Sequence, residues 1–187
     1  MALFPYADII VDSLSVTDAV SVVSSDTRSK QFLNRRTIGQ RYEIDMSCRV
    51  TPDKFLAANA YFTSLRGGTV VTEITLPFYG QNTVTNKTTS GALAIGVRAA
   101  TLASVTGVLP GMYFKFANHT KVYCCTSVAG SVVNFEPNLI RAVPNSTAVQ
   151  FNNVAITCKM TSPNASFGST GNKLPVTRNV KFVEVIG

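Results

Sequence analysis

The stretch RRTIGQRYEIDMSCRVTPDKFLAANAYFTSLRGGTVVTEITLP, residues 35–77, decides the fold. From Arg41 to Val50, apolar and polar side chains alternate without a break. A period of two with one polar face is typical of a half-buried antiparallel strand. The polar face carries Arg41, Glu43, Asp45, Ser47 and Arg49, and the apolar face is expected to enter the core.

A helix is predicted directly after this strand, over residues 52–66. Thr51 suits the N-cap position, and Pro52 suits the first helical position. Arg66 lies in the last turn, and two glycines follow it that permit a left-handed exit. A second strand, VVTEITLP, then completes a strand–helix–strand unit. The expected apolar stripe of the helix consists of Phe55, Ala58, Phe62 and Leu65.

Composition favours a β-rich protein that is covered by neighbours. The chain has 187 residues, of which 14 % are charged, and Val and Thr are abundant. An assembled subunit needs few solvating charges. Residues 1–73 hold eight bases and eight acids, whereas residues 74–187 hold nine bases and two acids. These bases stand singly, which favours protein contacts or solubility over nucleic acid. If the charge serves a partner contact, the bases expected there are Arg98, Lys115, Lys121 and Arg141.

The residues do not predict an enzyme, a cofactor or a metal site. His119 is the only histidine, and it lies in a probable hairpin turn where a polar residue is expected on structural grounds. Glu43 and Asp45 alternate with Arg41 and Arg49, which favours ion pairing between strands over acid–base chemistry. The four cysteines are expected to be buried, reduced thiols: Cys48, Cys124, Cys125 and Cys158.

The remaining segments predict further strands and loops. A strand is expected near residues 19–24, and a strand or loop near 31–34. Residues 77–92 and 161–175 read as loops, and residues 176–187 as a strand that returns to the first sheet. Residues 92–160 contain a series of short strands, which indicates a small barrel or sandwich. These strands are expected in ALAIGV, ATLASV, MYFKFA, TKVYCCTSV, SVVNF, AVQF and AITCKM.

The predicted fold class is therefore mainly β: a β-sandwich or barrel with one flanking α-helix and an inserted small all-β barrel. The predicted sandwich comprises residues 1–91 and 161–187, with the helix at 52–66. The predicted insertion comprises residues 92–160. The chain lacks a run of 18 apolar residues, so a membrane span is not expected.

Two sequence elements resemble minor tail and baseplate proteins of tailed bacteriophages. The first is the strand–helix–strand unit, which matches at Arg41-Tyr42-Glu43, Ser64-Leu65-Arg66-Gly67 and Leu76-Pro77. The second is PGMYFKFANHTKVYCCTSV followed by VVNFEPNLIRAV. Here Met112 replaces the usual Asp, and an extra Ile140 precedes Arg141. Together the elements span roughly residues 35–143.

The resemblance implies a fold related to tail-tube and distal-tail proteins. It implies a homo-oligomeric ring, commonly of six subunits, at the distal tail or baseplate of a virion assembled in the host cytoplasm. Its neighbours would be the tube, hub, wedge, sheath or fibre, with DNA only as transient cargo in the channel and no membrane. The ring sheet and helix would use Arg41, Glu43, Asp45, Arg49 and Arg66.

Two alternatives remain open at this point. The first is a nucleic-acid-binding β-barrel that stacks bases on aromatic side chains, although alternation within the strands favours a core role for these rings. The second is a host-surface carbohydrate-binding module, which the lack of Trp disfavours. The stacking residues of the first alternative would be Tyr113, Phe114, Phe116 and Tyr123.

Overall fold

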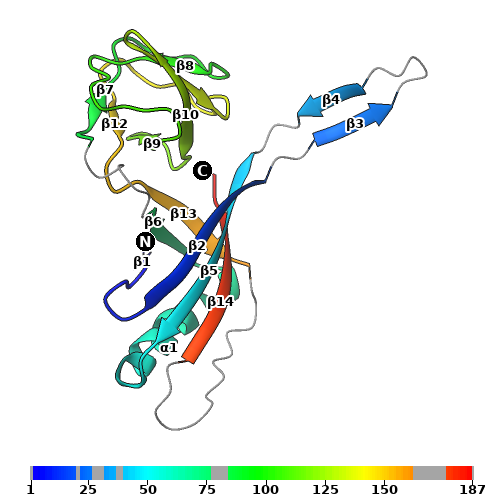
Figure 1. Cartoon of the computed structure of the whole chain (residues 1–187), viewed down its shortest axis with the longest axis vertical. Helices are drawn as coiled ribbons and strands as arrows, with labels where there is room; N and C mark the ends of the chain where they lie inside the picture. The colour runs from blue at the N-terminus through cyan, green and yellow to red at the C-terminus, as the bar shows by residue number, and fades with distance from the viewer. Residues whose placement is uncertain are drawn as a thin grey trace. The chain divides into compact units, whose positions relative to one another are not determined.

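The computed structural model describes residues 2–19, 22–26, 32–36, 40–76, 84–161 and 176–186. The protein is mainly β with one α-helix, as predicted, and its strands form two six-stranded sheets and one two-stranded sheet (Figure 1). The chain divides into two compact units. Unit 1 comprises Met1–Thr72 and Cys158–Glu184, and unit 2 comprises Glu73–Thr157 and Val185–Gly187.

The first sheet has the order β1-β6-β13-β14-β5-β2. Its strands are β1 (Ala2–Leu3), β6 (Val71–Thr75), β13 (Ala155–Met160), β14 (Val176–Glu184), β5 (Arg41–Val50) and β2 (Ile10–Ala19). Figure 1 shows β2, β5 and β14 running side by side.

Strand β5 has the predicted alternation, with every second side chain buried. The buried face consists of Tyr42, Ile44, Met46, Cys48 and Val50. The predicted return of the C-terminal segment is confirmed, because β14 pairs antiparallel with β5 from Val176 opposite Val50 to Val183 opposite Glu43. Burial of one face of a long central strand explains why this stretch folds as its pattern predicts.

Strand β2 was not predicted from the sequence. It pairs with β5 along its length, with a bulge between Val11 and Ser13. None of its side chains is fully buried, because β2 lies at the edge of the sheet. A polar, half-exposed edge strand lacks the alternation that marks β5. The strand expected near residues 19–24 corresponds to β3 (Val22–Asp26), which pairs with β4 (Phe32–Arg36).

The predicted helix is split into three pieces. A 3₁₀ turn, η1 (Pro52–Lys54), precedes α1 (Phe55–Ser64), and a second turn, η2 (Arg66–Gly68), follows it. Thr51 has the extended backbone of an N-cap, but its side chain makes no capping hydrogen bond. The predicted apolar stripe of the helix is largely confirmed, because Ala58, Phe62 and Leu65 are buried and Phe55 is half-buried.

The second sheet has the order β7-β12-β9-β10-β11-β8. Its strands are β7 (Lys87–Thr88), β12 (Ala148–Gln150), β9 (Tyr113–Phe116), β10 (Tyr123–Ala129), β11 (Val132–Glu136) and β8 (Ala99–Thr101). Phe114, Phe135 and Phe151 lie in a single core of buried residues inside this unit. β10 and β11 pair antiparallel as a hairpin, and Gly130, which lies between them, has a φ of 59°.

The structure corrects three predictions around the second sheet. AITCKM forms β13, which pairs with β14 in the first sheet and not within the predicted insertion. ALAIGV is not a strand, and its Leu93 makes only an isolated bridge to Val143. Strand β7 lies in the segment predicted as a loop and pairs with β12. Of the predicted loops, residues 77–83 and 162–175 lie outside the described residues.

Candidate interaction surface

The polar face of β5 carries ion pairs between strands. The Asp45 carboxylate lies 3.1 Å from Lys181 Nζ on β14, and the Arg49 guanidinium lies 3.0 Å from the Asp12 carboxylate on β2. Arg41 and Glu43 are exposed on the same face. Ion pairs with exposed partners contribute about 0–1 kcal/mol each. The expected pairing between strands is therefore present, and it leaves this face open to solvent.

A shallow pocket of about 230 Å³ lies on this face, between β5, β14 and the end of β13. Glu43, Asp45 and Lys181 supply its charges, and Thr161 adds a hydroxyl.

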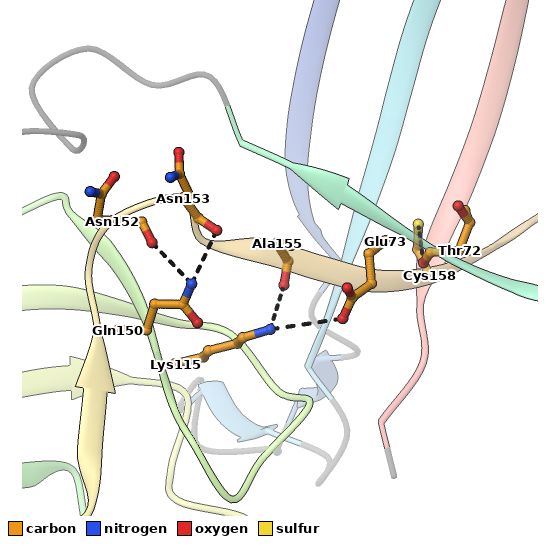
Figure 2. Close-up of polar contacts among 8 residues, drawn as sticks. All are labelled: Thr72, Glu73, Lys115, Gln150, Asn152, Asn153, Ala155 and Cys158. Carbon is orange, nitrogen blue, oxygen red and sulfur yellow. Dashed lines mark hydrogen bonds and ion pairs between the residues drawn. The ribbon is translucent and has the colours of Figure 1, made fainter. Parts of the chain in front are cut away.

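The Lys115 side chain makes polar contacts within unit 2, contrary to its predicted role in a partner contact. Its ammonium lies 3.9 Å from the Glu73 carboxylate and donates a hydrogen bond of 3.4 Å to the Ala155 carbonyl (Figure 2). Nearby, the Gln150 side-chain amide donates to the carbonyls of Asn152 and Asn153. Lys115 thus joins β9 to β6 and β13, and most of its side chain is shielded from solvent.

Lys121 is fully buried, so it does not lie on a partner surface. The prediction was wrong because residues 121–123, where the chain leaves a turn and enters β10, are all buried. Only the fold of unit 2 reveals this burial, because the local sequence reads as a turn followed by a strand.

Arg98 and Arg141 lie on the surface of unit 2, as predicted. Arg98 forms an ion pair of 3.1 Å with Glu136 and donates to the Asn138 side chain at 2.5 Å. The Arg141 guanidinium donates to the Asn118 carbonyl at 3.4 Å. Two of the four predicted bases are therefore placed where a partner protein could reach them.

His119 is buried, although its sequence position suggested an ordinary polar turn residue. Its Nδ1 lies 3.0 Å from the Tyr123 hydroxyl, which also accepts a hydrogen bond from the Ile140 N–H. Burial lowers the pKa of His119, and the positive charge of Arg141 lowers it further. A hydrogen bond with the Arg141 backbone acts in the opposite direction. Burial therefore favours the neutral imidazole, and its hydrogen bond with Tyr123 gives His119 a structural role inside unit 2.

The aromatic residues proposed to stack bases belong mostly to the core. Phe114, Phe116 and Tyr123 are buried and contact one another with ring centroids 5.5 to 5.8 Å apart. Tyr113 is half-buried. Alternation within β9 accounts for this, because Phe114 and Phe116 share one face. These rings do not form a surface platform for nucleic acid.

A buried arginine in unit 1 was not foreseen. The Arg178 guanidinium carbon lies 4.6 Å from the centre of the Phe62 ring, which is a cation–π arrangement. Burial raises the pKa of the nearby Cys48 thiol to about 12, although the positive charge of Arg178 opposes this shift. All four cysteines are free thiols, as expected; Cys48, Cys125 and Cys158 are buried as predicted, whereas Cys124 is only half-buried. The thiol of Cys48 is therefore protonated and unreactive at neutral pH.

Among the described residues, no helix is long and apolar enough to cross a membrane. The same residues contain no group of three or more His, Cys, Asp or Glu side chains placed to hold a metal ion. In comparisons with known proteins, no protein-family model matches the chain, and no curated protein matches its sequence.

Proposed function

We propose that this protein is a structural subunit of a bacteriophage tail, which forms a ring at the distal tail or baseplate and links the tube to the next component. The proposal rests on the resemblance of residues 35–143 to minor tail and baseplate proteins. The structural observation that supports it best is the edge strand β2. This strand pairs with β5 on one side and ends the first sheet on the other.

A ten-residue edge strand is a template for another strand. Among the described residues, no strand pairs with its outer edge, and edges of this kind pair readily with other chains. The opposite end of the sheet is β1, which has only two residues. A contact between unlike edges of successive copies is heterologous, and repetition of such a contact closes a ring when the rotation allows it.

The exposed bases of unit 2 are proposed to contact the next component of the tail. Arg98 and Arg141 are both exposed. Replacing both by Gln is expected to weaken incorporation into tails in a salt-dependent manner, because exposed charges steer association and are screened by salt.

This proposal is tested by quantifying the variant protein in purified tails at low and high ionic strength. The matched control replaces Lys87 and Lys159, which change the net charge equally. The proposal predicts reduced loading for Arg98→Gln/Arg141→Gln and normal loading for the control. Equal loading of both variants at every salt concentration would refute the assigned surface, and absence of wild-type protein from tails would refute the function.

A further inference from the structure

The outer face of α1 lacks the charges that an exposed helix face ordinarily carries. None of its ten residues, FLAANAYFTS, is charged. Ala58 and Phe62 face the core, yet Leu56, on the opposite side, is 80 % exposed. A helix that is apolar on most sides is usually covered on most sides. This face therefore has the character of an interface.

The exposed residues form a continuous stripe along the helix. Leu56, Ala60 and Thr63 follow one another at i, i+4 and i+7, and Ala57, Asn59 and Ser64 lie beside them. Residues at this spacing are neighbours on one side of a helix. All six are exposed and uncharged. The small side chains around the middle permit another helix to approach closely, and Leu56 supplies a projecting apolar group.

The charges at the two ends of this stripe identify the occupant. Asp53 is exposed just before α1, and Arg66 is exposed just after it. Lys54, the neighbour of Asp53, already pairs with Asp8 at 3.1 Å. This surface has one acid at its N-terminal end, one base at its C-terminal end and an uncharged stripe between them. It therefore complements a second copy of itself that is turned end to end.

We propose that α1 docks antiparallel against α1 of a second copy of this chain across a twofold axis. Ala60 lies near that axis, Leu56 of each copy packs near Thr63 and Ser64 of the other, and Asp53 of each copy faces Arg66 of the other. The antiparallel arrangement also opposes the two helix dipoles favourably. This contact is separate from the edge of β2 and does not depend on the proposed ring.

The contact is tested on the full chain by sedimentation equilibrium over a range of protein concentrations. Leu56→Glu replaces the projecting apolar group of the stripe by a carboxylate. It is expected to raise the dissociation constant at least about tenfold, which lowers the mean mass toward that of the monomer at intermediate concentration. The matched control is Leu109→Glu, because Leu109 is 60 % exposed in unit 2. The control should retain the wild-type mass.

A charge exchange makes the test specific for the antiparallel geometry. Asp53→Arg and Arg66→Asp are each expected to weaken the dimer, because each brings like charges together, and the double variant is expected to restore it. The proposal is overturned if Leu56→Glu and Leu109→Glu have the same mass as wild type, or if the double variant is weaker than both single variants. Loss of incorporation into tails by Leu56→Glu without a change in mass would assign the face to a different protein, which also overturns the proposal.

Discussion

At the scale of single residues, the backbone conformation and a close neighbour both require glycine at position 68. Its φ is +94°, and a Cβ built there would lie 1.9 Å from the Met160 carbonyl oxygen, which is backbone and cannot move aside. Gly96 has a similar φ of +87° but open space around it. The two glycines therefore separate the cost of a close backbone approach from the cost of the left-handed conformation.

Gly68→Ala is expected to lower the free energy of unfolding by about 3 kcal/mol or more, because strain in φ of roughly 1–2 kcal/mol is joined by a clash with backbone. Gly96→Ala should lower the free energy of unfolding only by the strain in φ, because the space around Gly96 is open. Urea denaturation of both variants checks this prediction. Equal losses of unfolding free energy for the two variants would contradict the prediction and show that the backbone around Met160 shifts to accommodate the added methyl group.

His119 gives the stability of unit 2 a dependence on pH. Because burial lowers the pKa of His119 below its ordinary value of 6.5, the unfolded chain binds a proton more readily than the folded chain. The contribution of His119 to stability is therefore complete above about pH 6.5 and declines as the pH falls below that value. Urea denaturation at pH 7 and pH 5 should show a smaller decline for His119→Gln than for wild type. An identical decline in both proteins would exclude His119 as the titrating group.

At the scale of elements, the alternation of β5 predicts opposite outcomes for neighbouring residues. Ile44 is fully buried, whereas Asp45 is exposed in its pair with Lys181. Ile44→Ala is expected to cost about 2–5 kcal/mol in unfolding free energy, and Asp45→Ala less than about 1 kcal/mol. Thermal or urea denaturation measures both values, and similar losses would contradict the assigned faces of the strand.

Local patterns predicted the elements whose burial follows one face. Strand β5 and the core stripe of α1 could be recognised because their side chains alternate between one core and solvent. Strand β2 could not be recognised, because an edge strand without fully buried side chains carries no such pattern. The uncharged outer face of α1 is visible in the sequence as a run without Asp, Glu, Lys or Arg, and only the structure shows that Leu56 is exposed.

The candidate surface was predicted less well than the fold. Arg98 and Arg141 are exposed as expected, but the burial of Lys121 and the pairing of Lys115 with Glu73 depend on contacts between residues far apart in the sequence. The charge of a residue indicates that it prefers solvent, and only the packed unit shows where that preference is overridden.

At the scale of the whole molecule, each compact unit buries its own set of apolar residues. Phe114 belongs to the core of unit 2, and Ile44 is buried in unit 1. Calorimetry is therefore expected to resolve two unfolding transitions, with Phe114→Leu lowering one midpoint and Ile44→Ala the other. A single transition that both substitutions shift equally would show that the units unfold together.

The central claim is that this chain works as a self-assembling structural subunit, and its mass in solution tests that claim most directly. Light scattering on the purified full-length chain over a wide range of concentrations is expected to reach a plateau at a fixed multiple of 20.1 kDa greater than two, as a closed ring requires. A mass of 20.1 kDa at every concentration would contradict the account.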